Sequence, residues 1–514
     1  MKTPALSLLV TAAFATAAQA VVKLPALISD NMVLQQDLPA NVWGWADAGE
    51  KVSVKFGGKS AEATADAKGK WGVKLAGLAS GATGELTVAG TNTLTIKNVA
   101  VGEVWVCSGQ SNMEWTVRAA QNPEAEIAAA NFPLIRHFAV AKSPQKEPQD
   151  DCKGKWEVCS PQTAAGFTAV GYFFGRQLHE KLKVPVGLIH SSWGGTPAEF
   201  WTPWPVLSGD PDLKSLTTAW EKIAGEYPAA KAKYDADMAA WSEAEKTAKE
   251  AGTPPPAKPK SPKGGDALGS PASLYNGMIA PLLPYTIRGA TWYQGESNAS
   301  NANQYRKLFP SMIQSWRQAW QLPEFPFLFV QLASYMQRHD EPTDTNWARL
   351  REAQTMALAL PHTGMALAID VGDAKDIHPK DKQTVGKRLA LSAEATVYYR
   401  DVDYSGPMFG GAQLEGEKVR LTFRNGEGMK PSEGEKVKGF AIAGEDRKFV
   451  WADAEIAGDH VIVSSPGVKA PVSVRYAWAD NPECNLVNAA GLPASPFRTD
   501  DWAMGPAPVE PAVK

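Results

Sequence analysis

A serine at the end of a strand-forming run is the first feature of the sequence that could do chemistry. Residues 102–115 read GEVWVCSGQSNMEW, so a run of β-forming residues stops at a short polar turn that contains Ser111. Open α/β sheets bind their ligands beyond the carboxyl ends of their strands, where a sharp turn exposes a serine hydroxyl. The pattern makes Ser111 a candidate nucleophile, provided that other segments supply its partners.

A histidine suited to activate such a serine lies in a second polar segment. His378 stands in IDVGDAKDIHPKDKQTVGKRLA (residues 369–390), after a strand-like run and before a helical pattern. Serine hydrolysis needs a base, and a carboxylate that fixes the tautomer of that base. Asp376 is the first candidate, since residues two apart in an extended segment point the same way, and Asp373 and Asp370 are the alternatives. The competing interpretation is that Asp376 only caps the following turn.

Two further predicted strands end in turns that carry glycine or amide groups. The segment SSWGGTPAEFW contains Gly194 and Gly195, whose amides no side chain shields. The segment TWYQGESNAS offers the side chains of Gln294, Glu296 and Asn298. Because donors aimed at a developing oxyanion are part of serine hydrolysis, four such turns in one domain indicate a single site.

The elements that must position these turns alternate between strands and helices over residues 101–400. Apolar runs such as VPVGLIHSS and FPFLFVQLA are separated by helical patterns such as GYFFGRQLHEKL. Such alternation indicates a parallel sheet covered on both faces. We therefore expect an α/β catalytic domain over this range.

β-rich regions flank that domain. Short alternating runs that end at Gly, Asn or Asp fill residues 21–100, and alternation returns over residues 401–514. We expect an N-terminal β domain and a C-terminal β domain, both sandwich-like. Residues 205–274 form an insertion, predicted as a helical hairpin with a break near Pro228, followed by a proline-rich linker.

The first twenty residues have the pattern of an export signal. Lys2 precedes an apolar run over residues 5–18, and the small-residue cleavage site AQA precedes Val21. No later stretch offers about 18 uninterrupted apolar residues, so no membrane partner is expected. The sequence predicts an exported protein, periplasmic or secreted.

Composition narrows the class of partner. The formal net charge is −3, from 52 basic and 55 acidic residues, which leaves no basic surplus for a nucleic-acid backbone. The 18 tryptophans are typical of core packing, but exposed indoles also stack on sugar faces. A carbohydrate partner is therefore a hypothesis.

The four cysteines suggest one disulfide and no zinc site. Cys152 and Cys159 lie in a polar stretch of a chain predicted to be exported, and we expect them to be bonded to each other. Cys107 lies inside an apolar strand, which favours a buried structural thiol over a nucleophile.

Five segments together resemble a known family. SGQSNMEW, SSWGGTPAEFW, WYQGESN and DIHPKDKQTVGKRLA, in this order, and the late NPECNLVNAAGLPASPF are similar to the sialate O-acetylesterases, which belong to the SGNH (GDSL-like) hydrolases. The resemblance implies a three-layer α/β/α domain with a parallel sheet. It also implies a serine esterase for acetylated carbohydrates that needs no metal and no organic cofactor.

The resemblance implies the nucleophile and the oxyanion donors. Ser111 matches the nucleophile, and its own amide would be one donor. Gly195, or its neighbour Gly194, matches the glycine of the second block. The third block departs from the Gly-x-Asn-Asp pattern of the superfamily, so a side-chain donor would come from Gln294 or from Asn298, and Gln294 is favoured because it lies nearer the strand end.

The resemblance also implies the base and the substrate contacts. His378 matches the base, but the Asp-x-x-His spacing of the superfamily is shortened here, and Lys375 occupies the usual aspartate position. Asp376 remains the first candidate for the third member of the triad. The residues expected to contact substrate are Gln110, Asn112, Trp193, Gly194, Glu296 and Asn298.

The substrate stays open between acetylated sialic acid and acetylated plant cell-wall polysaccharide. A sialate enzyme would need a cation for the sugar carboxylate, and Arg338 and Arg349 are the candidates. A non-catalytic carbohydrate-binding protein on the same fold is the alternative function. A lipase or peptidase has no support, because the sequence offers no long apolar lid.

Overall fold

The computed structural model describes residues 21–264, 268–322, 324–503 and 505. The predicted export signal, residues 1–20, lies outside the described residues. In the part of the chain that is described, no helix is both long and apolar enough to cross a membrane.

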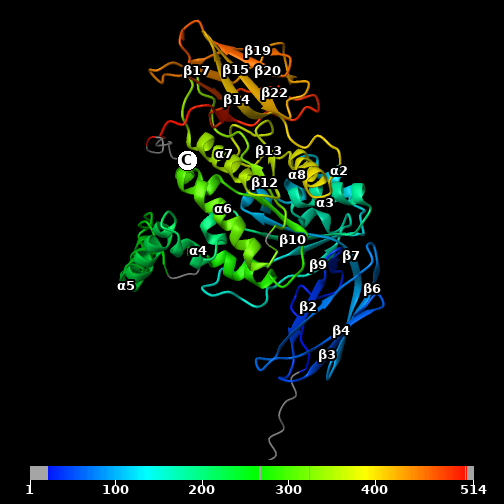
Figure 1. Cartoon of the computed structure of the whole chain (residues 1–514). Coiled ribbons are helices and arrows are strands. Elements are labelled where there is room, and N and C mark those ends of the chain that lie inside the picture. The colour runs from blue at the N-terminus through cyan, green and yellow to red at the C-terminus, as the bar shows by residue number, and fades with distance from the viewer. Residues whose placement is uncertain (1–20, 265–267, 323, 504, 506–514) are drawn as a thin grey trace, which may run out of the picture.

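A large mixed sheet forms the centre of the molecule (Figure 1). In the main row of this sheet six strands are parallel, and β9 joins the edge antiparallel to β8. In spatial order the row is β13 (Thr363–Leu367), β12 (Phe327–Gln331), β11 (Gly289–Tyr293), β7 (Thr93–Gly109), β10 (Val186–Ser192), β8 (Ile135–Ala139) and β9 (Trp156–Val158). The alternating strand and helix pattern over residues 101–400 predicted this parallel row.

Both faces of the central sheet are buried. In β7, Val104 and Val106 belong to one hydrophobic core, whereas Trp105 and Cys107 belong to another. Helix α6 (Ala302–Ala319) contributes to the first core, and α3 (Ala169–Leu182) and α8 (Lys382–Thr396) contribute to the second. The fold is therefore mixed α/β, and the finer three-layer SGNH arrangement stays a prediction.

Strand β7 is 17 residues long and joins the N-terminal β region to the central sheet. Its first half pairs antiparallel with β6 (Thr83–Ala89), which pairs with β3 (Lys51–Phe56). Its second half is the middle strand of the parallel row, between β10 and β11. The N-terminal strands thus continue the sheet that carries the turn with Ser111.

The C-terminal residues form antiparallel sheets around a core of their own (Figure 1). One four-stranded sheet has the order β14-β15-β20-β19, and the other has the order β18-β17-β21-β23. Their bounds are β14 (Met408–Glu415), β15 (Lys418–Arg424), β20 (His460–Ser464), β19 (Asp453–Ala457), β18 (Val450–Trp451), β17 (Phe440–Ala443), β21 (Ser473–Tyr476) and β23 (Phe497–Arg498). Residues of both sheets share this core, as in a sandwich.

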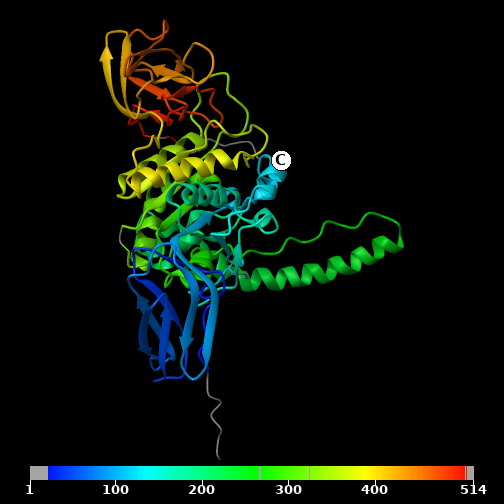
Figure 2. The same ribbon diagram turned by 90° about the vertical axis from the view of Figure 1, so that its right-hand side faces the viewer.

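The prediction that the insertion forms a helical hairpin is wrong. Residues Lys214–Glu250 form a single helix, α5, with Pro228 inside it, and Figure 2 shows it extending away from the body with the following segment running back beside it. Trp241 Nε1 donates to the carbonyl of Pro256 at 2.8 Å, which fastens the returning segment. A proline inside a helix costs about 3 kcal/mol. The alanine, lysine and glutamate residues around Pro228 favour the helix strongly enough for it to continue past the proline.

The predicted disulfide is absent, because Cys152 and Cys159 are both free thiols. Cys159 Sγ points to the carbonyl oxygen of Ala130, 3.6 Å away, and belongs to the second hydrophobic core. Cys152 packs against the first core instead. The spacing of the two cysteines in the sequence does not reveal that their side chains pack in different hydrophobic cores. Cys107 is buried as expected, and burial raises the pKa of its thiol to about 12.

Candidate active site

Three of the predicted turns lie side by side at the carboxyl edge of the sheet. Gly109, the last residue of β7, is level with Ser192 of β10 and with Tyr293 of β11. Gly109 has φ +137°, and a Cβ there would lie 2.2 Å from the carbonyl oxygen of Tyr293, so glycine is required for the strands to end this close. The parallel arrangement brings the turns together as the sequence predicted.

Ser111 is the first residue of the short helix α1 (Ser111–Glu114) and is partly exposed. Gln110, directly before it, is buried, and its Oε1 accepts from the amide of Ser297 at 3.2 Å and from the amide of Gly295 at 3.5 Å. Gln110 thus ties the turn after β7 to the turn after β11. Its side chain holds the backbone in place, whereas Ser111 is partly exposed.

His378 lies in the loop between β13 and α8, with its ring held by Asp376. The imidazole Nδ1 is 3.3 Å from Asp376 Oδ1, which also accepts the amide of His378 at 2.9 Å. The other candidates are engaged elsewhere: Asp370 binds Arg388 at 2.6 and 2.7 Å, and Asp373 accepts amides of its own turn. Burial lowers the pKa of His378, partly opposed by Asp376, so the ring is neutral at neutral pH.

The His378 loop packs against the helix that Ser111 begins. The ring of Trp115, just after α1, stacks on the imidazole with centroids 4.9 Å apart and planes 17° apart. Asn112 Nδ2 donates to the carbonyl of Ile377 at 3.1 Å. No hydrogen bond joins the Ser111 hydroxyl to His378 among the described residues, and such contacts commonly tighten only when substrate binds.

Of the two glycines in the second turn, Gly194 lies against Ser111. A Cβ on Gly194 would be 3.2 Å from Ser111 Cβ, whereas a Cβ on Gly195 would meet nothing within 4 Å. The Gly194 amide donates to Glu114 Oε2 at 2.6 Å, and Glu114 Oε1 pairs with Lys142 at 2.5 Å. The Gly194 amide is therefore occupied by a carboxylate.

Gln294 is fully buried and bonded on both sides of its amide. Its Nε2 donates to Asn298 Oδ1 at 2.6 Å and to the carbonyl of Thr196 at 3.3 Å, and its Oε1 accepts from the Tyr305 hydroxyl at 3.0 Å. Asn298 is also buried, and its Nδ2 donates to Glu199 Oε2 at 2.9 Å. These contacts use both amide hydrogens of Gln294, which counts against its predicted oxyanion role. They brace the second turn against the third.

Asn112 and Glu296, both expected to contact substrate, bind each other and a lysine that the sequence analysis missed. Asn112 Nδ2 donates to Glu296 Oε1 at 2.6 Å, and Asn112 Oδ1 accepts from Lys382 Nζ. Glu296 Oε2 is buried with no hydrogen-bond partner in the described chain. Lys382 Nζ also lies 5.7 Å from the ring centre of Trp115 and 5.4 Å from that of Tyr293.

Burial moves the pKa values of the two charged groups toward each other. It raises the pKa of Glu296, and it lowers the pKa of Lys382 to about 7 against the pull of nearby carboxylates. Lys382 is the first residue of α8, in a charged run that gives no signal to separate it from exposed lysines. Of the predicted substrate contacts, Gly194 lies against Ser111, and Trp193 directly precedes it in the second turn.

A second serine–histidine pair lies within the sheet. His190 Nε2 is 2.6 Å from Ser192 Oγ, on the same face of β10. Ser192 is only 5% exposed, and burial lowers the pKa of His190 to about 4. The pair has good hydrogen-bond geometry, but its serine is buried, whereas Ser111 is partly exposed.

Comparisons with known proteins point to one family. The family described as "Carbohydrate esterase, sialic acid-specific acetylesterase" matches residues 262–394. The sialate O-acetylesterase of Rattus norvegicus is 30% identical over 91% of this chain and 93% of its own, and that of Homo sapiens is 29% identical over 91% of each. The crystal structure of XAC1771, a carbohydrate acetylesterase from Xanthomonas citri, superposes with a TM-score of 0.81 at 39% identity, covering 94% of this chain and 100% of that one.

These relatives cover the β regions at both ends as well as the central sheet, so the likeness is not confined to a shared core. The chain therefore belongs to the sialate O-acetylesterase family and is a carbohydrate esterase.

Proposed function

We propose that the protein is a serine esterase that removes O-acetyl groups from carbohydrates. Ser111 is the nucleophile, His378 the base, and Asp376 the carboxylate that orients the base. The observation that carries the proposal is the position of the imidazole, which is 3.3 Å from Asp376 and stacks on Trp115, directly after the short helix that begins at Ser111. Because burial lowers the pKa of His378, the ring is neutral at neutral pH and can accept a proton.

The reaction follows the usual two steps. His378 Nε2 takes the proton of the Ser111 hydroxyl as the oxygen attacks the acetyl carbonyl, and the tetrahedral intermediate then expels the sugar oxygen, which receives that proton. The acetyl-enzyme is hydrolysed by a water that His378 deprotonates in turn. Asp376 stabilises the imidazolium in both steps.

We assign the oxyanion donors to backbone amides. The Ser111 amide is one, and the glycine turn supplies the other. The sequence favours Gly195 for this role, but Gly194 is the glycine that lies against Ser111. Donation from Gly194 requires Glu114 to release its amide, to which it is bonded at 2.6 Å.

We favour a neutral acetylated polysaccharide over acetylated sialic acid. Neither arginine predicted for a sugar carboxylate is well suited to it. Arg349 is buried and bonded to Asp344, and Arg338 is 61% exposed and 3.7 Å from Glu483. The names of the vertebrate relatives point to sialate, so both substrate classes enter the test.

The test measures acetate release by wild type, Ser111→Ala and Ser192→Ala. The substrates are p-nitrophenyl acetate, acetylated xylan, xyloglucan and pectin, and acetylated sialic acid. We expect Ser111→Ala to lose turnover and Ser192→Ala, the matched control, to retain it. A wild-type protein that binds these glycans but releases no acetate would support the non-catalytic alternative.

We also propose that the protein is exported and that its mature form begins near Val21. The support is the charged, apolar and small-residue pattern of residues 1–20. N-terminal sequencing of the protein from its native host should begin at Val21. An intact Met1 would overturn the proposal.

A further inference from the structure

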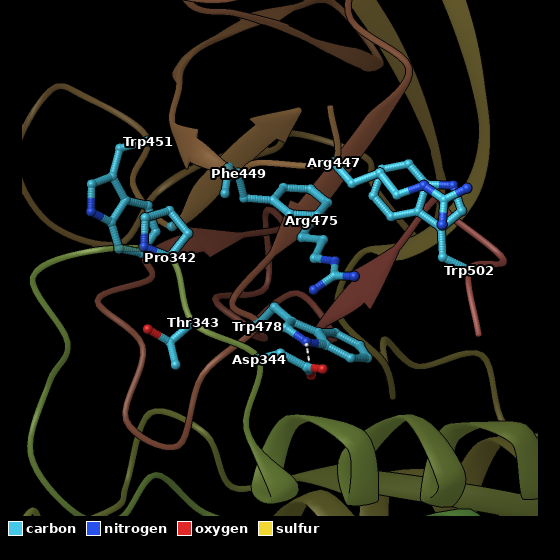
Figure 3. Close-up of a pocket in the computed structure, with 11 residues that line it drawn as sticks. Pro342, Thr343, Asp344, Arg447, Phe449, Trp451, Arg475, Trp478 and Trp502 are labelled. Atoms are coloured by element: carbon cyan, nitrogen blue, oxygen red, sulfur yellow. Dashed lines mark hydrogen bonds between the residues drawn. The ribbon is translucent and has the colours of Figure 1, made fainter. Parts of the chain in front are cut away.

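A pocket of about 300 Å³ lies between the catalytic domain and a C-terminal sheet (Figure 3). The wall from the catalytic domain is the segment 342–344, which follows β12. The opposite wall comes from β17, β18 and β21 and from Trp502. Ser111, Gly194 and His378 do not line it, so the pocket is separate from the candidate active site.

Four aromatic rings contribute to the lining of this pocket. Figure 3 shows Trp451 at one end and Trp502 at the other, with Phe449 and Trp478 between them. Trp451 is 45% exposed, although a large apolar side chain on a monomer is ordinarily covered. An exposed indole beside a polar pocket is the arrangement that stacks on the C–H face of a sugar ring.

The rings are fixed before any ligand arrives. Trp451 Nε1 donates to the carbonyl of Asp340 at 2.7 Å, and Trp478 Nε1 donates to Asp344 Oδ1 at 3.0 Å. Both acceptors belong to the catalytic domain, so these bonds hold the two walls together. A ring that is already immobile loses little entropy when a ligand stacks on it.

Two guanidinium groups supply polar contacts. Arg475 stacks 4.1 Å from the ring centre of Phe449 and is held by Asp500 through bonds of 2.9 and 3.2 Å. Arg447 lies 5.0 Å from the ring centre of Trp502 and forms no ion pair with another described residue. Arg447 is therefore available to bond hydroxyl or carboxylate oxygens of a ligand.

We propose that this pocket is a second, non-catalytic binding site for sugar units of a glycan. A ring stacks on Trp451 or Trp502, and its oxygens accept hydrogen bonds from Arg447. The site goes beyond the proposed esterase function, because none of its lining residues takes part in the chemistry. It would hold a polymer on the enzyme while acetyl groups are removed elsewhere.

Binding is measured by titration calorimetry with unacetylated probes, so that no turnover occurs. Xylohexaose and a xyloglucan heptasaccharide test neutral sugars, and sialyllactose tests a sugar carboxylate. The variants are Trp451→Ala and, as a matched control, Tyr399→Ala, which removes an aromatic side chain that is 81% exposed and lies outside this pocket. A third variant, Arg447→Ala, removes the exposed guanidinium that is proposed to bind the oxygens of the sugar.

We expect at least one probe to bind, with an affinity about tenfold weaker in Trp451→Ala and unchanged in Tyr399→Ala. Turnover of p-nitrophenyl acetate should stay at the wild-type level in all three variants, which also shows that they fold. This readout separates the binding site from the esterase, since loss of esterase activity in Ser111→Ala leaves probe binding intact.

The proposal is overturned if the wild type binds none of the probes. It is also overturned if a bound probe keeps its wild-type affinity in both Trp451→Ala and Arg447→Ala. Preference for the neutral probes or for sialyllactose identifies the class of sugar.

Discussion

Lys382→Met should impair the esterase although the lysine touches no substrate. Methionine keeps most of the length of the side chain and its packing over Trp115 and Tyr293, but it removes the ammonium that donates to Asn112. Asn112 follows Ser111 and also binds the carbonyl next to His378 at 3.1 Å. The lysine therefore acts as a positioning residue for both halves of the site.

The size of the effect follows from geometry. If Asn112 turns when it loses its partner, the His378 loop shifts relative to Ser111. A misplacement of about 1 Å can cost about 100-fold in rate, or ~2.7 kcal/mol on the barrier. The charge has a separate effect, because Lys382 also lowers the pKa of His378, and its removal should raise that pKa.

The assay is the pH profile of kcat/KM with p-nitrophenyl acetate. Lys382→Met should show a lower plateau and an acid limb moved to higher pH. Lys387→Met, which removes an exposed lysine from the same helix, should match the wild type. A purely structural role would lower the thermal midpoint without moving the acid limb, so a folded Lys382→Met with the wild-type profile would refute the reasoning.

Three further predictions concern the other residues of the site. Asp376→Asn should lower kcat by about 10⁴-fold by favouring the wrong tautomer of His378, whereas Asp373→Asn should stay within a few-fold of wild type; the reverse result would move the orienting role to Asp373. Wild-type kcat/KM should rise with pH through a pKa below 6.5, the ordinary value for histidine, because the base must be neutral and burial lowers the pKa of His378. An acid limb with a pKa above 6.5 would contradict a lowered pKa for this base. Gln294→Leu should lower the free energy of unfolding by about 1–3 kcal/mol in denaturant titrations, because Asn298 and Tyr305 lose a buried hydrogen-bond partner. An unchanged stability together with a loss of turnover of about 10²–10³-fold would instead place Gln294 in the oxyanion hole.

The sequence predicted the placement of the turns better than the contacts within them. Parallel strands follow from short apolar runs between helices, and parallel strands bring their carboxyl ends to one edge. Ser111 and Gly194 lie together there for that reason. The pairing of Asp376 with His378 also follows from local geometry, because the two residues are only two apart.

Other features depend on contacts that no local pattern encodes. Gln294 is predicted to donate to the oxyanion and Asn298 to contact substrate, but the two side chains bond to each other and to residues of other segments in a buried network. The charged run around Lys382 predicts an exposed side chain. The side chain is buried instead, because it lies at the start of α8, where the helix packs against the site. Cys152 and Cys159 join different cores, although their spacing in the chain suggests a bond.

The central claim is that Ser111 is the nucleophile, and covalent labelling tests it most directly. The wild-type protein is treated with a fluorophosphonate, digested, and mapped by mass spectrometry. The account predicts a single adduct on Ser111, which disappears in His378→Ala because the hydroxyl is no longer activated. An adduct on Ser192 or on another serine, with Ser111 unmodified, would contradict it.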